Sequence, residues 1–408
     1  MVGTVFLAHI ATVAFILGIA ILAPIAEWLG TRPDGERWSR LSYDLSHTIV
    51  LLFAFGATWV VFALMMLYGL YPYLFNALVG IFFWIWVGIG ILWIIMTVSA
   101  YVYYESRARL GMGSWRHMAI GWTFAVSSAI FISLVTATGS YQLTPTSPTP
   151  LITAFFTAAW GPQIIHRQIG NVSYAGLILA GFVGWRLLFT RRLTDKDRAH
   201  YDWLGDIAIL IGIGFALIQP VVGWFYAHQI LVGSPGAFAI MMLGANSWLF
   251  LLQGGLLGLV LFLGDLYFVF AMRRGNPSPA MRTWLWVSLG LIALLTGLLM
   301  VPSGFPLGLM FPWKYISLAG MPLIVLTNLV LYLRARRSFQ WGVSDRKAPQ
   351  VAMLLVGVSI MALLVTMGVI RESARGSYLI FGVMPANEAQ QIIPAEPRPQ
   401  PGFPGEQQ

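Results

Sequence analysis

The 408-residue chain contains no cysteine. Disulfide bonds, thiolate metal sites and covalently attached c-type haem are therefore excluded. Charge is also scarce: Asp, Glu, Lys and Arg make up 10% of the chain, whereas soluble domains have about a quarter. This composition excludes an ordinary soluble domain.

Several catalytic motifs are absent as well. The sequence has no Walker-type phosphate loop, no HExxH zinc motif and no nucleophile elbow. The formal net charge of +9 does not indicate nucleic-acid binding, because 19 of the 24 basic residues fall in alternate connections between apolar segments. The composition and the absence of these motifs together favour a membrane protein.

Long apolar runs dominate what is present. Hydrophobic residues form 58% of the chain, and the mean hydropathy is +0.77. Each run can cross a hydrocarbon core of about 30 Å as a helix, and none has the ~10-residue alternation of barrel strands. The sequence therefore predicts an all-α, polytopic membrane bundle of about ten helices, near residues 4–28, 46–69, 76–103, 118–139, 168–190, 203–227, 236–271, 284–301, 312–333 and 350–370.

The basic connections predict the orientation. They cover residues 29–45, 104–117, 186–203, 272–283 and 334–347. By the positive-inside rule they face the cytoplasm, so both termini are expected on the outer, periplasmic side. The first apolar run lacks a basic leader, which favours a retained helix over a signal peptide. Residues 372–408 are Pro-rich and predict an extended outer tail, which a partner subunit would hold.

Ionisable residues near the helix ends are the candidates for function, because burying them in a membrane is costly. With this topology, three imidazoles and one carboxylate fall at the outer ends of helices: His9, His166, His228 and Glu372. Together they could bind haem or a metal ion. Three more imidazoles fall at inner ends: His47, His117 and His200. For any one of them, snorkelling to the interface is the simpler alternative. His200, beside TDKDRAH, is expected to be solvated.

Four segments resemble subunit I of cytochrome bd-type quinol oxidases. His9, Gly18 and Glu27 match the spacing of that family's first helix, and HMAIGW (117–122) matches the opening of its fourth. His166 begins a segment with the family's spacing of glycine and tryptophan, and ESARGSY (372–378) resembles a degenerate Glu-x-Gly-Arg-Gln-Pro-Trp. The resemblance covers residues 4 to about 230 and about 312 to 384.

The resemblance implies a haem-binding bundle over residues 1–371, with two or three haems of b type. By analogy, His9 and Glu372 are axial ligands of active-site haems, and His166 binds the low-spin haem. Arg375 falls on an arginine that could pair with a haem propionate or a quinol oxygen. Residues 236–301 have no counterpart and are expected to be a two-helix insertion replacing the family's outer quinol loop.

The second ligand of the low-spin haem stays open. The family uses a methionine, but WKYISLAG (313–320) places Leu318 at that position. Met321 lies nearly on the same face and is the favoured candidate. Met241 and Met242 in FAIMMLG, and His228, are the alternatives.

The third predicted helix departs from the family, because it has no carboxylate before Glu105 where the family has proton-delivering glutamates. Dioxygen reduction would then need a modified proton path. The candidates for such a path are Glu27, Asp44, His47, Asp206 and Asp265.

The sequence thus predicts a haem b subunit of a respiratory complex in the bacterial inner membrane. Electrons would pass between quinol or quinone and haems near the outer face. Expected partners are a second membrane subunit, periplasmic cytochrome subunits (multihaem c-type among them), or both. A transporter or channel, suggested by ALIQPVVG (216–223), and a cofactor-free scaffold for periplasmic cytochromes are the alternatives.

Overall fold

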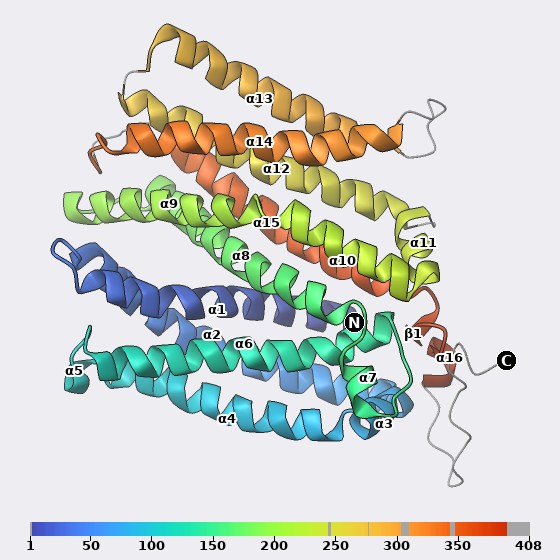
Figure 1. Cartoon of the computed structure of the whole chain (residues 1–408). Coiled ribbons are helices and arrows are strands. Elements are labelled where there is room, and N and C mark those ends of the chain that lie inside the picture. The colour runs from blue at the N-terminus through green and yellow to red at the C-terminus, as the bar shows by residue number, and fades with distance from the viewer. Residues whose placement is uncertain (1, 244–245, 276, 303–309, 343–346, 390–408) are drawn as a thin grey trace. The chain divides into compact units, whose positions relative to one another are not determined.

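The computed structural model describes residues 2–243, 246–275, 277–302, 310–342 and 347–389, and helices dominate it (Figure 1). Within these ranges, ten helices are long and apolar enough to cross a membrane. A helix satisfies its own backbone hydrogen bonds, as a segment in lipid must. The prediction of an all-α, ten-helix membrane bundle is confirmed. Of the predicted tail, residues 390–408 lie outside the described residues.

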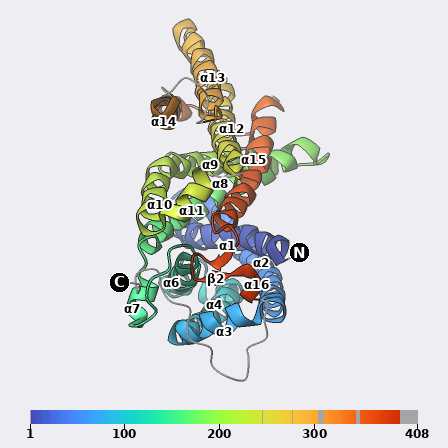
Figure 2. The ribbon, with the colours of Figure 1, turned by 90° about the vertical axis from the view of Figure 1, so that its right-hand side faces the viewer.

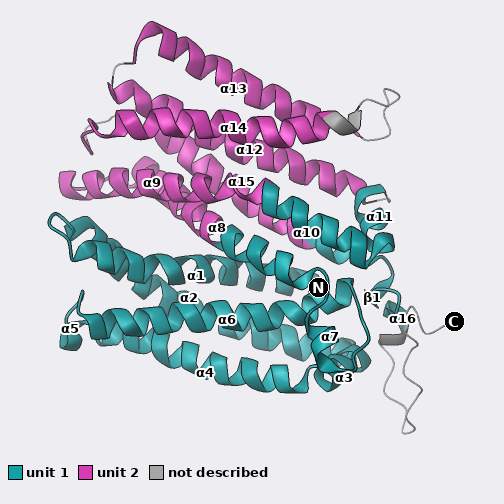
Figure 3. Ribbon diagram, viewed as in Figure 1, with its two compact units in different colours: residues 1–171, 221–246, 369–408 teal, residues 172–220, 247–368 magenta. Residues whose placement is uncertain are grey.

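The chain forms two compact units (Figure 3). Unit 1 comprises residues 1–171, 221–246 and 369–408, and unit 2 comprises residues 172–220 and 247–368. The helix α8 (Trp160–Phe189) contributes to both units.

Four long helices form the body of unit 1: α1 (Val2–Gly30), α2 (Glu36–Leu70), α4 (Phe83–Glu105) and α6 (Trp115–Leu143). They run side by side in both ribbon views (Figures 1 and 2). The remaining elements are α3 (Pro72–Ile81), α5 (Arg107–Leu110), α7 (Leu151–Phe155), most of α10 (Gln219–Gly233), α11 (Pro235–Leu243), β1 (Tyr378–Ile380), β2 (Met384–Pro385) and α16 (Ala386–Ala389).

A small antiparallel hairpin closes one end of unit 1. Its strands β1 and β2 pair Tyr378 with Pro385 and Ile380 with Met384. The Phe381 N–H donates to the Gln142 carbonyl of α6 at 2.9 Å. The hairpin is thereby attached to the end of α6.

Unit 2 contains the rest of α8, α9 (Asp195–Ala216), α12 (Ser247–Met272), the 3-10 turn η1 (Arg273–Gly275), α13 (Pro279–Leu299), α14 (Met310–Arg336) and most of α15 (Lys347–Ser373). Glycines allow α8 to approach two neighbours. A Cβ on Gly181 would lie 2.8 Å from the Cα of Gly357 in α15, and a Cβ on Gly176 would lie 2.7 Å from the Gly212 nitrogen in α9. Small residues at such crossings are how helices pack in lipid.

Several predicted helix boundaries were wrong. The helices α2 and α8 begin at Glu36 and Trp160, not at 46 and 168, so His47 and His166 lie inside helices rather than at their starts. Hydropathy identifies only the part of a helix that is apolar enough for the hydrocarbon core. Polar turns that extend the helix beyond this part do not raise the hydropathy, so the predicted helix begins too late.

Three predicted single helices are also interrupted. The segment 76–103 divides into α3 and α4 at Phe82, and 236–271 divides into α11 and α12 around residues 244–245, which lie outside the described residues. The segment 203–227 divides into α9 and α10 just before Pro220. Proline has no N–H to donate to the carbonyl four residues earlier, at Ala216, and its ring crowds that carbonyl, which explains why α9 ends there.

Candidate functional site

His9 lies in the third turn of α1 and contacts α2. Its Nδ1 is 3.2 Å from the carbonyl oxygen of Gly56. A carbonyl oxygen can only accept, so Nδ1 carries the proton and Nε2 of the neutral ring keeps its lone pair. A backbone carbonyl that fixes the ring in this way is the usual support of a metal-ligating histidine. His9 therefore fits a haem ligand.

His166 lies in the second turn of α8 and faces α10. Its ring stacks on Tyr226 with 5.9 Å between centroids. A Cβ on Gly223, three residues before Tyr226, would lie 3.4 Å from the imidazole Cε1. The backbone of α10 at Gly223 therefore lies against the imidazole ring.

The start of α8 is fixed to α6 by side-chain hydrogen bonds to backbone oxygens. Trp160 donates from Nε1 to the Ser133 carbonyl at 3.1 Å, and Gln168 donates from Nε2 to the Ala129 carbonyl at 3.2 Å. These bonds set the register of α8 on α6 and so position His166.

Three candidate second ligands lie in unit 1. His228 is exposed and stacks on Trp224 of its own helix. It is about 140° around α10 from Gly223 and about 160° from Tyr226, so it points away from the face that meets His166. Met241 is buried on α11, and Met242 beside it is half-buried.

The favoured second ligand, Met321, lies in unit 2. It is fully buried on α14, and its sulfur accepts a hydrogen bond from the Thr296 hydroxyl at 3.3 Å. Its assignment as a haem ligand stays a prediction.

Two arginines lie against one face of α6 in unit 1. Arg167 donates from Nη1 to the Thr136 hydroxyl at 3.4 Å. The guanidinium of Arg371, from α15, fills the space over Gly139. Thr136 and Gly139 are three residues apart and share a helix face. The charge of Arg167 also acts on His9, which places the starts of α1 and α8 at one end, called the His9 end below.

Glu372 and Arg375 lie just beyond this pair and bind each other. Arg375 donates from Nη2 to the Glu372 carboxylate and from Nη1 to the Leu379 carbonyl at 2.6 Å. Burial lowers the pKa of Arg375, while the neighbouring Glu372 carboxylate opposes the shift. Glu372 itself is 59% exposed. Arg375 therefore holds the turn between α15 and the hairpin.

A hydrogen-bond network missed in the sequence lies at the other end of α1. His117, buried on α6, places Nδ1 2.7 Å from Oε1 of Glu27 and donates from Nε2 to the Tyr103 carbonyl at 2.8 Å. Glu27 also accepts from the Tyr103 hydroxyl at 2.8 Å and the Gly113 N–H at 2.7 Å. Both imidazole nitrogens are occupied, so this histidine anchors helices. Nothing in the sequence pairs residues 90 apart.

His47 and Asp44 lie near this network on α2. His47 is exposed and stacks on Tyr104 with 5.3 Å between centroids, while Asp44 is half-buried. Arg107 covers the neighbouring Tyr43 ring, 3.7 Å from its centroid. The group resembles an interfacial belt, and its place in a proton path stays a prediction.

His200 on α9 was expected to be solvated, and that expectation is wrong. Its exposed fraction is 3%, and its ring contacts those of Tyr201 and Trp203. The flanking charges lie on the first turns of α9, whose amphipathic winding buries one face and exposes the other.

Two acids of α9 anchor other helices of unit 2. Asp206 pairs with Nε of Arg336 at 2.5 Å and accepts from the hydroxyls of Tyr267 and Tyr332. Asp202, one turn earlier, receives both Nη groups of Arg274 at 2.9 and 2.7 Å. These contacts give Asp206 a packing role beside its predicted place in a proton path.

Asp265 has a different environment, within α12, α13 and α14. It is fully buried and accepts from the Asn328 amide nitrogen at 2.9 and 3.0 Å, while Ser288 lies 3.5 Å away. The described residues include no cation that pairs with it. Asp265, Asn328 and Ser288 form a buried polar triad in the interior of unit 2.

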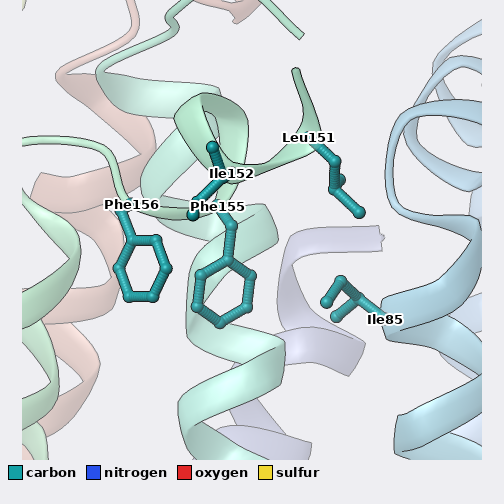
Figure 4. Close-up of a pocket in the computed structure, with 5 residues that line it drawn as sticks. All are labelled: Ile85, Leu151, Ile152, Phe155 and Phe156. Carbon is teal, nitrogen blue, oxygen red and sulfur yellow. The ribbon is translucent and has the colours of Figure 1, made fainter. Parts of the chain in front are cut away.

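A pocket of about 310 Å³ in unit 1 is apolar throughout. Figure 4 shows its lining residues, which come from α4, α7 and the residue after α7: Ile85, Leu151, Ile152, Phe155 and Phe156. It has no group that could bind iron.

These elements define a class, the polytopic α-helical membrane protein. By sequence, no known family and no curated protein matches the chain. By structure, the chain is similar to bd oxidase from Geobacillus thermodenitrificans, with a TM-score of 0.55 and 13% identity over 91% of this chain and 96% of that one. The chain therefore has a bd oxidase-like fold.

Proposed function

We propose that this chain is a haem b-containing membrane subunit of a respiratory electron-transfer complex in the bacterial inner membrane. Electrons would pass between quinol or quinone and haems near the His9 end. The haems would supply the one-electron chemistry. A second membrane subunit, periplasmic cytochromes, or both would complete the complex.

One observation carries the proposal: the hydrogen bond that leaves Nε2 of His9 available, in a bd oxidase-like fold. His166, on α8, provides a second imidazole in the same unit, and Glu372 provides a carboxylate with one oxygen bound to Arg375. The chain's own residues would orient these ligands. His9, His166 and Glu372 are therefore the residues that would hold the haems.

Electron transfer is favoured over dioxygen reduction, which consumes protons at a buried site. The helices α3 and α4 carry no carboxylate before Glu105 at their end. The paired Asp206 is poorly suited to a relay, because Arg336 and two tyrosines already bind it. We therefore assign this chain the exchange of electrons with quinol.

The test is a reduced-minus-oxidised spectrum of the purified complex, with and without carbon monoxide. We expect a haem b band that His166→Ala removes in part. A protein without haem b would rule out the proposal. A haem that binds carbon monoxide would instead restore the oxidase version.

A transporter is the second candidate, favoured by the buried Asp265–Asn328–Ser288 triad. Transporters bind substrate or coupling ions at such interior polar sites. Proteoliposomes containing the chain would then show ion or proton uptake that Asp265→Asn abolishes. The haem reading predicts no such flux.

A further inference from the structure

Arg167 and Arg371 bring two positive charges together inside membrane-spanning helices. Arg167 reaches Thr136, and Arg371 covers Gly139, on the same face of α6. The two guanidinium groups are close enough for their charges to repel. Charged side chains within a membrane span are costly, and repulsion between like charges adds to the cost.

No carboxylate of the described residues forms an ion pair with either arginine. Glu372, the acid beside them in sequence, binds Arg375 instead. Two other polar neighbours are Thr136, which Arg167 binds, and Tyr226. The positive charges of Arg167 and Arg371 both act on Tyr226. A bound anion would stabilise these two positive charges, because no carboxylate of the described residues pairs with them.

The position of the pair indicates which anion. Arg167 follows His166 directly on α8, and its charge acts on His9. A b-type haem bound by an adjacent imidazole carries two carboxylates on one edge. Guanidinium forks bind carboxylates in bidentate geometry and remain charged when buried.

We propose that Arg167 and Arg371 bind the propionate carboxylates of the haem held by His166. This inference rests on the proposed function. It differs from the role that the resemblance gives to Arg375, whose two Nη groups already bind Glu372 and Leu379.

The test compares Arg167→Gln and Arg371→Gln with the wild-type complex in nanodiscs. Exposed Arg116 is the matched control, as Arg116→Gln. Removing a positive charge beside the haem should favour the ferric state. We expect a tenfold or larger shift in the ferric–ferrous equilibrium, which is about 59 mV for one electron. Arg116→Gln should leave the potential unchanged.

A second readout applies if the glutamine variants do not accumulate. Arg167→Lys and Arg371→Lys keep the charge but lose the fork, so resonance Raman bands of propionate bending should shift. Wild-type potentials in both glutamine variants, or unshifted Raman bands in both lysine variants, would overturn the inference.

Two further outcomes are distinguishable. Haem-free wild-type protein would overturn the proposed function and this inference together. Normal haem potentials combined with loss of a co-purifying anionic lipid, measured by native mass spectrometry, would overturn the inference alone and assign the pair to a headgroup phosphate.

Discussion

Glu27 and His117 form a buried acid–base pair, with 2.7 Å between Oε1 and Nδ1. The pair joins the end of α1 to the start of α6, and the Tyr103 hydroxyl adds α4 to the same carboxylate. Three of the four long helices of unit 1 therefore share one acceptor group. Buried networks of this kind fix an arrangement only when every member is satisfied.

Glu27→Gln should destabilise the protein. The amide keeps the size of the side chain but loses the charge that His117 and Tyr103 bind, so we expect a loss of about 1.5–3 kcal/mol. Thermal unfolding in detergent measures it. Exposed Glu105→Gln on α4 is the control and should change little; equal melting temperatures for the two variants would contradict the anchoring role.

His9→Ala should remove one haem from the complex, because His9 Nε2 is the proposed ligand atom. The pyridine haemochrome assay gives haem per protein. Gly56→Ala is a demanding control: it keeps the carbonyl that orients the ring, and the added Cβ meets only ordinary contacts at 3.7 Å. Full haem content in His9→Ala would exclude His9 as a ligand.

Asp206→Asn and Asp265→Asn should differ in stability. Asp206→Asn leaves Arg336 without its carboxylate and should lower the free energy of unfolding by about 3 kcal/mol. This is the low end of the range for a buried ion pair, because Arg336 is 26% exposed. The second replaces a buried carboxylate that has no cation among the described residues, and should change stability by less than about 1 kcal/mol. Chemical unfolding of both variants decides the point; the reverse order would show that Asp265 is ionised and paired.

Arg375→Ala should loosen the hairpin while leaving the helices intact. It removes the bonds to Glu372 and to the Leu379 carbonyl. The second bond contributes about 1.5–3 kcal/mol net, as is typical of a hydrogen bond to a charged group, and the exposure of Glu372 reduces the share of the first. Amide hydrogen exchange across 376–389 should rise about tenfold or more. The control Arg116→Ala should not affect this segment, and unchanged exchange in Arg375→Ala would mean that Arg375 does not hold the turn.

Gly176→Ala should disrupt the α8–α9 crossing. The new methyl would lie 2.7 Å from the Gly212 nitrogen and 2.9 Å from the Ala208 oxygen, both backbone atoms that cannot yield easily. We expect a loss of about 1–3 kcal/mol. Gly214→Ala, on α9 with open space around it, should instead gain up to about 1 kcal/mol from helix propensity. Thermal unfolding compares the two, and similar effects at both positions would argue against the close crossing.

The sequence predicted the class of fold well because hydropathy is additive along the chain. Ten apolar segments and their basic connections are visible residue by residue. The helix interruptions at Phe82 and before Pro220 were missed, since both flanking segments are equally apolar.

The candidate site was predicted only in part. His9 and His166 were named from spacing, and the structure adds their supports, the Gly56 carbonyl and the α10 face at Gly223. The partners of His117, Asp206 and Asp265 could not be inferred, because each bond joins residues far apart in sequence. Long-range pairing depends on helix packing, which one sequence does not specify.

The contact of Gly181 with Gly357 has a consequence for temperature. Lipid tails are as apolar as the helices, so water release contributes little to this crossing, and close dispersion contacts hold it. The hydrophobic effect weakens on cooling, but dispersion does not depend on ordered water. The α8–α15 crossing should therefore persist in the cold, where cores built on water release lose strength.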